Sequence, residues 1–166
     1  MKNRDGHCTL LIDGDIIAFG AVSAALEDFE WSPGIWTTYC DHNAAREKFH
    51  RDIKKIVDEM DRHTSKLVEV VLCITGEGNF RRDVLPTYKG HRKRKPPGYR
   101  QFQEWILNES GYETFLRPGL EADDCLGILS TAAMSIHGIE RVIWSADKDL
   151  MQIPGLHLEF DVKRKG

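Results

Sequence analysis

Two apolar runs constrain the fold of this chain most, because neither of them alternates between apolar and polar residues. They read CTLLIDGDII at 8–17 and KLVEVVLCIT at 66–75, and both are rich in Val, Ile and Leu. Strands that are buried on both faces of a parallel sheet have this composition. We therefore expect both runs to form central strands of a parallel sheet.

The segment between these runs has helical periodicity. Within 41–63 the apolar residues recur at steps of three and four, and Asp41 stands at the start as a candidate N-cap. The expected buried positions are Ala45, Phe49, Ile53, Ile56, Val57 and Met60. The same reasoning predicts helices at 96–110 and 121–138, strands at 112–116, 141–147 and 156–162, and a turn between two short strands at 31–36. Helices that alternate with buried strands indicate an open α/β sheet with right-handed crossovers.

Composition limits the class of protein. The chain has 166 residues, of which 41% are hydrophobic, which suits a single domain. Its net charge of -3 gives no indication of nucleic-acid binding, so that signal depends on how the charge is distributed. Four isolated cysteines indicate neither a zinc site nor a disulfide framework, and a reduced, cytoplasmic setting is expected. The sequence shows no signal segment and no membrane-spanning run, so we expect no membrane partner.

Acidic side chains follow the expected strands in three groups. Sites in open α/β sheets form at the carboxyl ends of the strands, so we expect these groups to meet at one edge. Taken singly, each group also fits helix capping or the start of a loop. The groups are Asp13 with Asp15, Glu121 with Asp123 and Asp124, and Asp147 with Asp149.

Carboxylates that are crowded together repel one another, and a hard divalent cation relieves this repulsion. Ligands that are all oxygen favour Mg²⁺ or Mn²⁺ over zinc. Two such ions about 4 Å apart hold both the attacking and the leaving oxygen of a phosphodiester displacement. The acids therefore predict a site for two ions of this kind.

Positive charge is concentrated in 79–100, NFRRDVLPTYKGHRKRKPPGYR. Aromatic residues are interleaved with the basic ones, as in surfaces that follow the backbone and stack on the bases of single-stranded nucleic acid. A solvated basic loop or a localisation signal is the alternative. The basic residues are Arg81, Arg82, Lys89, Arg92, Lys93, Arg94 and Lys95, and the aromatic residues are Phe80, Tyr88 and Tyr99.

Four motifs in this order, LLIDGD, NFRRDVLPTYKGHRKRKPPGY, LEADDCLG and SADKDLMQIPG, resemble the metal-dependent 5′ nucleases. This family includes flap endonucleases, the 5′-nuclease domain of bacterial DNA polymerase I and phage 5′-to-3′ exonucleases. The segments CDHNAAR and KPPGY make the likeness strongest to the exonuclease of T-odd tailed phages, and the likeness runs along nearly the whole chain. It implies a PIN-like α/β domain in which a basic, helical arch at about 79–100 is threaded by a 5′ end.

The resemblance also implies roles for individual residues. Lys89 and Arg92 match basic residues that reach the scissile phosphate, and Tyr88 matches an aromatic residue that stacks on a base. DNA with 5′ ends or flaps is the implied partner, and the RNA of RNA–DNA hybrids is a further one. The implied metal ligands are Asp13, Glu121, Asp123, Asp124, Asp147 and Asp149. The remaining expected nucleic-acid contacts are Arg81, Arg82, Lys93, Arg94 and Lys95.

The sequence departs from the family pattern in two places. Gly76 stands where the family strand ends in an Asp, so Glu77 is either a displaced ligand or an ordinary loop acid. The family also continues into a helix-three-turn-helix region that grips duplex DNA, and the 166 residues do not include it. Either the sequence is a fragment, or a separate chain supplies that grip.

The expected function is that of a magnesium-dependent 5′ nuclease acting on DNA. A non-catalytic protein that binds nucleic-acid structures with a degenerate metal site is the alternative, and Gly76 supports it. A toxin-type PIN ribonuclease has similar acids but gives no reason for the basic segment.

Overall fold

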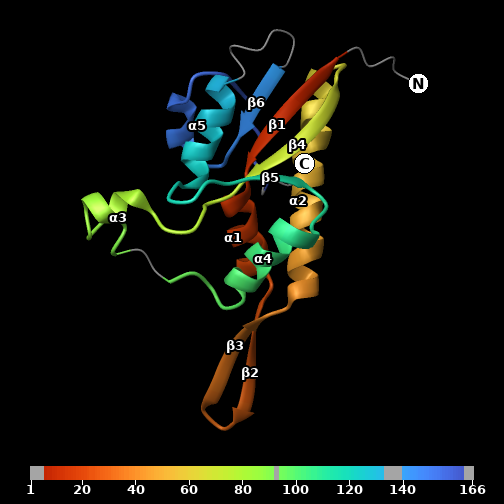
Figure 1. Ribbon diagram of the computed structural model, residues 1–166. Helices are drawn as coiled ribbons and strands as arrows, with labels where there is room; N and C mark the ends of the chain where they lie inside the picture. The colour runs from red at the N-terminus through yellow and green to blue at the C-terminus, as the bar shows by residue number, and fades with distance from the viewer. Residues whose placement is uncertain (1–5, 92–93, 133–139, 163–166) are drawn as a thin grey trace.

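A five-stranded parallel sheet forms the centre of the molecule (Figure 1). The computed structural model describes residues 6–91, 94–132 and 140–162. The strands pair in the order β5-β4-β1-β6-β7, and every pairing is parallel. The expected α/β fold is therefore confirmed. The strands are β1 (His7–Asp13), β4 (Leu67–Cys73), β5 (Glu113–Phe115), β6 (Glu140–Trp144) and β7 (Leu156–His157).

Helices cover both faces of the sheet. On one face, Leu10 and Ile12 of β1 belong to a core that includes α1 (Gly14–Ala24), α2 (His42–His63) and α4 (Tyr99–Glu109). On the other face, Leu11 belongs to a second core with Cys125 and Leu126 of α5 (Ala122–Ala132). This alternation along β1 is what a strand buried on both faces requires.

The first apolar run was predicted wrongly beyond residue 13. The strand ends at Asp13, whose side chain accepts a hydrogen bond from the Ile16 backbone N–H and so caps α1. Helix α1 buries one face, which includes Ile17, Ala18 and Val22, but Ile16 and Phe19 outside that face are also apolar, so the helix lacks the amphipathic pattern by which a helix is recognised. The second run likewise ends early, at Cys73 rather than at residue 75.

Helix α2 agrees with its prediction. Asp41 caps it by accepting hydrogen bonds from the Asn43 and Ala44 N–H groups, and the expected apolar face is buried except at Val57, which is partly buried. Helix α4 begins at Tyr99, directly after Gly98, whose φ of 77° is accessible to glycine. The predicted helix at 121–138 is confirmed to Ala132, and residues 133–139 lie outside the described part. The edge strand β7 is shorter than predicted.

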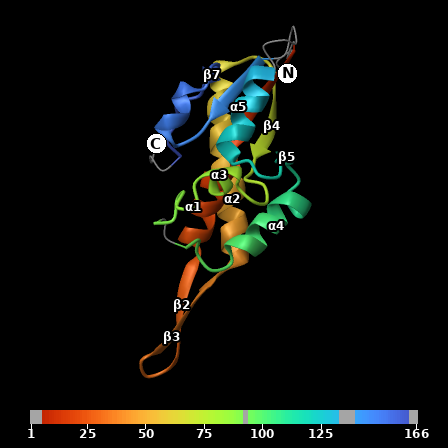
Figure 2. The same cartoon turned by 60° about the vertical axis from the view of Figure 1, so that its left-hand side comes forward.

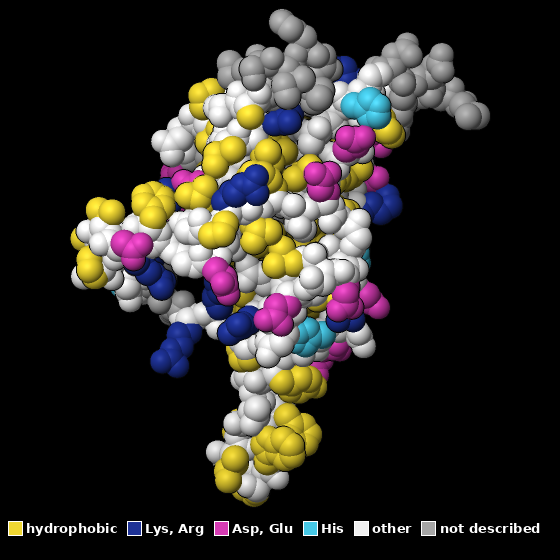
Figure 3. Space-filling model, viewed as in Figure 1, with side chains coloured by type: hydrophobic (Ala, Val, Ile, Leu, Met, Phe, Trp, Pro, Cys, Tyr) yellow, Lys and Arg dark blue, Asp and Glu magenta, His cyan; other side chains and the backbone are white. Residues whose placement is uncertain are grey.

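A β-hairpin projects from the body beyond α1 and α2 (Figures 1 and 2). Its strands β2 (Leu26–Ser32) and β3 (Ile35–Cys40) are antiparallel and form a separate two-stranded sheet, which confirms the predicted turn. Trp31 and Trp36 are 69% and 59% exposed, and hydrophobic side chains gather over the hairpin in Figure 3.

Helix α3 (Phe80–Val84) lies away from the sheet, and all five of its residues are at least partly exposed. It is the helical portion of the described basic segment before α4, so the helical arch that the resemblance implied is reduced here to one short helix and turns. In the part of the chain that the structure describes, no helix is both long and apolar enough to cross a membrane.

Candidate functional site

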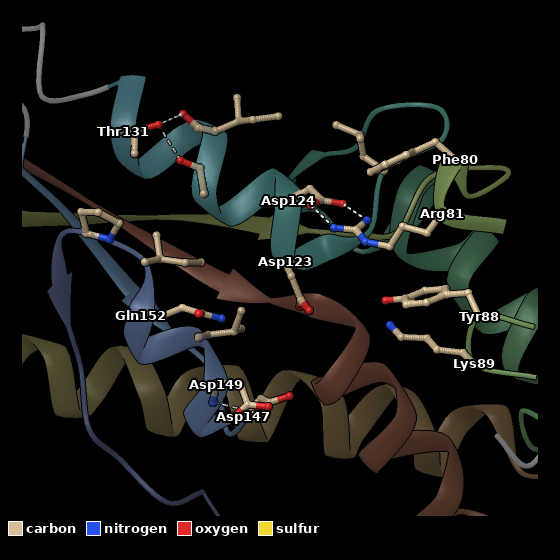
Figure 4. Close-up of a pocket in the computed structure, with 16 residues that line it drawn as sticks. Phe80, Arg81, Tyr88, Lys89, Asp123, Asp124, Thr131, Asp147, Asp149 and Gln152 are labelled. Atoms are coloured by element: carbon tan, nitrogen blue, oxygen red, sulfur yellow. Dashed lines mark hydrogen bonds and ion pairs between the residues drawn. The ribbon is translucent and has the colours of Figure 1, made fainter. Parts of the chain in front are cut away.

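The three groups of acids reach the same edge of the sheet, as predicted. Asp13 ends β1, Asp147 caps the 3-10 helix η2 (Lys148–Gln152) that follows β6, and Asp123 lies in the first turn of α5. A cleft of about 880 Å³ opens between α5, η2 and the basic segment (Figure 4). Its charged and aromatic lining includes Arg81, Tyr88, Lys89, Asp123, Asp124, Asp147 and Asp149.

Asp13 is a buried carboxylate, 2% exposed. Its oxygens accept hydrogen bonds from the Ile16 N–H at 3.2 Å and the Ser145 hydroxyl at 3.0 Å. Burial raises the pKa of Asp13 to about 7, and the charges of Asp15 and Asp123 add to this rise while the two hydrogen bonds oppose it. A buried acid of this kind is stabilised in its ionised form by a cation.

Asp123 points into the cleft, between Asp147 and Asp149 on one side and Tyr88 and Lys89 on the other (Figure 4). Burial raises its pKa, and the charges of Glu121, Asp147 and Asp124 raise it further, whereas Lys89 lowers it. Asp123 therefore experiences the negative charge of acids from both α5 and the loop after β6. This crowding is what the sequence predicted for a cation site.

Glu121 is held by side chains of the basic segment. The Lys89 ammonium donates to both of its oxygens, at 2.7 and 2.8 Å, and the Tyr88 hydroxyl donates at 3.1 Å. The Asn79 side chain donates a further hydrogen bond at 2.9 Å. Burial by itself raises the pKa of Glu121, but the contacts with Lys89 and Tyr88 and the charge of Arg81 outweigh it and lower the pKa below its usual value.

Asp124 forms a two-pronged ion pair with Arg81. The two guanidinium Nη atoms lie 2.7 Å from the two carboxylate oxygens, and the Glu121 N–H donates to Oδ2 at 3.0 Å. The hydrogen bonds from Arg81 hold the pKa of Asp124 below its usual value. Both residues line the cleft (Figure 4).

Lys89 has a left-handed backbone conformation, with φ at 53°. This conformation costs a residue with a side chain about 1 kcal/mol, and such strain is concentrated at functional sites. The Lys89 ammonium binds Glu121, and Lys89 lines the cleft.

Asp147 and Asp149 lie across the cleft from the basic segment (Figure 4). Asp147 accepts a hydrogen bond from the Asp149 N–H at 3.0 Å, which fixes the turn after β6. Among the described residues, no three His, Cys, Asp or Glu side chains form a group ready to hold a metal ion. Glu121 and Asp124 are instead engaged by Lys89 and Arg81.

Gly76 is required by packing. A Cβ atom at this position would lie 2.0 Å from the carbonyl oxygen of Arg117, because the backbone of Gly76 runs along 117–120 and donates to the Leu120 carbonyl. An Asp cannot be accommodated here without moving the backbone. Glu77 is exposed and lies outside the lining of the cleft.

The other predicted contacts are distributed along the basic segment. Arg82 is exposed on α3, Arg94 and Lys95 are exposed before α4, and the Lys95 ammonium lies 4.0 Å from the centre of the Tyr99 ring. Arg92 and Lys93 lie outside the described residues.

Two polar residues of the site were missed from the sequence. Asn79 caps α3 and also donates to Glu121, and Thr75 accepts a hydrogen bond from the Ala122 N–H at the start of α5. An Asn before a short apolar and basic stretch is a helix-start signal, which could have identified the first of them.

Comparison with known proteins gives a family match along most of the chain. A model described as "5'-3' exonuclease, N-terminal resolvase-like domain" matches residues 8–160. The chain is 34% identical over 153 residues to the exodeoxyribonuclease of Enterobacteria phage T3 and, equally, to the exonuclease of Escherichia phage T7, in each case over 90% of this chain and 50% of the relative. It is 29% identical over 163 residues to DNA polymerase I of Streptococcus pneumoniae, over 95% of this chain and 17% of that protein.

Solved structures give a more distant likeness. The T5 D15 protein co-crystallised with metal ions has 16% sequence identity and a TM-score of 0.49, and the alignment covers 86% of this chain and 49% of that one. The chain spans about half the length of the phage relatives it matches.

Proposed function

Because the chain belongs to the family of 5′-3′ exonuclease N-terminal, resolvase-like domains, we propose that it is a metal-dependent 5′ nuclease that hydrolyses phosphodiester bonds of DNA. The position of Asp123 carries this proposal, since it faces acids after β6 on one side and Lys89 on the other (Figure 4). The name of the phage T3 relative, an exodeoxyribonuclease, supports DNA as the substrate.

The donor set fits a hard divalent cation. The acids at the edge are oxygen ligands, and the raised pKa values of Asp13 and Asp123 reflect burial and negative charge that a cation would offset. When bound, two Mg²⁺ or Mn²⁺ ions lower the pKa of water and offset charge on the phosphate. We assign the ions to Asp13, Glu121, Asp123, Asp147 and Asp149.

The chain's own residues bind and orient the substrate in this proposal. Lys89 exchanges its bonds to Glu121 for bonds to the scissile phosphate, where its charge offsets that of the transition state. Arg92 adds a second positive charge there. Tyr88 stacks on a base at the mouth of the cleft, and the exposed Arg82, Lys93, Arg94 and Lys95 follow the phosphate backbone of a 5′ end or flap. An RNA strand of an RNA–DNA hybrid presents the same phosphates.

A second candidate is a non-catalytic protein that binds DNA structures. Gly76 favours it, because the packing against Arg117 excludes the strand-end Asp of the family and leaves the site one carboxylate short.

Cleavage assays separate the two candidates. The purified protein is incubated with 5′-labelled flap, duplex and single-stranded DNA in Mg²⁺, in Ca²⁺ and in EDTA. The nuclease releases short labelled products in Mg²⁺ and none in EDTA. Binding to flap DNA without products in Mg²⁺ would support the second candidate and overturn the first.

A further inference from the structure

The guanidinium of Arg81 binds another side chain of the protein, that of Asp124. Both Nη atoms bind Asp124 at 2.7 Å, and the Arg81 side chain is 30% exposed. The guanidinium also lies 4.7 Å from the centre of the Phe80 ring and 5.9 Å from that of Tyr88. A two-pronged bond between guanidinium and carboxylate fixes both distance and orientation, which a single ammonium does not.

Polar contacts hold residues 79–81 of the basic segment against residues 119–124. Helix α3 exposes Phe80 and Val84, and Leu85, which follows the helix, is 54% exposed. Burial of apolar surface therefore contributes little to the position of α3. The contacts run instead to 119–124: Asn79 to Glu121, the Phe80 N–H to the Gly119 carbonyl, and Arg81 to Asp124. Among them, the charged contacts of α3 are made by Arg81, which pairs with Asp124 at 2.7 Å and lies 4.0 Å from a carboxylate oxygen of Glu121.

Arg81 comes shortly before Tyr88 and Lys89 in the chain, and those two residues face the cleft. The Leu85 N–H donates to the Arg81 carbonyl, and the Tyr88 N–H donates to the Leu85 carbonyl. Two backbone hydrogen bonds therefore link Arg81 through Leu85 to Tyr88, and the strained Lys89 is the next residue in the chain.

We propose that Arg81 is a positioning residue, and that its two-pronged bond to Asp124 holds Tyr88 and Lys89 at the first turn of α5. The role of Lys89 in cleavage rests on the proposed function, but the restraint by Arg81 does not. In this proposal Arg81 makes a contact within the protein, in place of the expected contact with DNA.

Hydrogen exchange of the protein without substrate tests the restraint. The amides of Leu85, Tyr88 and Gly90 are hydrogen-bonded within the segment and report its order. Arg81→Lys and Asp124→Asn should each speed their exchange about tenfold, and the double variant should be no faster than Arg81→Lys, because Arg81→Lys already removes the two-pronged bond to Asp124. Arg82→Lys, on the same helix and exposed, is the matched control and should exchange like the parent. Parent-like protection in Arg81→Lys, or equal effects in Arg82→Lys, would overturn the proposal.

DNA binding and cleavage supply the second readout. With flap DNA in Ca²⁺, Arg81→Lys should keep its affinity within about twofold and keep the salt dependence of binding, while single-turnover cleavage in Mg²⁺ falls at least tenfold. A direct phosphate contact by Arg81 would instead weaken binding in Arg81→Ala and reduce the salt slope by about one, with exchange unchanged, and that result would contradict the proposal. If the parent cleaves nothing, the exchange experiment still tests the restraint.

Discussion

Asp13 is a buried carboxylate whose ionised form is costly in the absence of a bound cation. Its pKa is about 7 in the folded chain, mainly because of burial, against an ordinary value of 3.8. A folded pKa above the unfolded one means that the unfolded chain loses its proton first as the pH rises. Folding stability therefore falls between about pH 4 and pH 7, and the full penalty is present above pH 7.

Asp13→Asn should stabilise the metal-free protein at pH 8. Asn still accepts the capping hydrogen bond from the Ile16 N–H and removes the buried charge. Unfolding by urea in EDTA should therefore show a free energy of unfolding that is higher by on the order of 1–3 kcal/mol. The gain should shrink as the pH is lowered to 4, and cleavage in Mg²⁺ should be lost. A variant less stable than the parent at pH 8 would contradict the assigned pKa.

Gly76→Asp should destabilise the protein and should not increase cleavage. The new Cβ would lie 2.0 Å from the Arg117 carbonyl oxygen, so the strand-end loop must shift, at a cost above about 2 kcal/mol. Gly20→Ala in α1 is the matched control, since no atom lies within 4 Å of its Cβ position and Ala favours helix. Urea unfolding should show a lower free energy of unfolding in Gly76→Asp and a slightly higher one in Gly20→Ala. Higher activity in Gly76→Asp would mean that the site tolerates the family's carboxylate here.

At the scale of single elements, the helices with one polar face were predictable and the helix without one, α1, was not. Helix α2 has an apolar stripe and an Asp41 cap, and its sequence predicted it closely. Helix α1 continues an apolar run without a polar face, so Ile16 and Ile17 were assigned to the strand before it. Only the capping by Asp13 reveals the boundary.

The same distinction holds for the site. The shared edge of the acids follows from the parallel direction of the strands, which the sequence predicted. The pairing of Arg81 with Asp124 joins residues 43 positions apart and depends on how the basic segment folds back on α5, which no local pattern records. The packing of Gly76 on Arg117 is equally non-local.

The basic segment should divide into residues that act on the chemical step and residues that bind. Lys89→Ala should slow single-turnover cleavage at least a hundredfold, because Lys89 reaches the cleft. Arg94→Ala, which removes an exposed charge, should mainly weaken binding and reduce its salt slope by about one. Equal effects on affinity alone in both variants would argue against a transition-state role for Lys89.

At the scale of the whole molecule, the outer part of the hairpin stands apart from the core, whereas Cys40 and Leu26 at its base contact it. Trp31 and Trp36 are largely exposed, so Trp31→Ser with Trp36→Ser should change the free energy of unfolding by no more than about 0.5 kcal/mol. Phe49→Ala, at 0% exposure in the core, should cost about 3–5 kcal/mol. Urea unfolding of both variants measures this contrast, and a large loss in the Trp variant would show that the hairpin stabilises the body.

The sheet edge, the cleft and the basic segment together make Asp123 the residue on which the account depends. The most direct test is single-turnover cleavage of a 5′-labelled flap by the parent and by Asp123→Asn over a range of Mg²⁺ concentrations, with DNA affinity measured in Ca²⁺. Asp28→Asn, an exposed acid of the hairpin, is the control. We predict saturable, Mg²⁺-dependent cleavage by the parent and the control, and at least a thousandfold loss in Asp123→Asn with affinity kept within about twofold. Undiminished cleavage by Asp123→Asn, or cleavage in EDTA, would contradict the account.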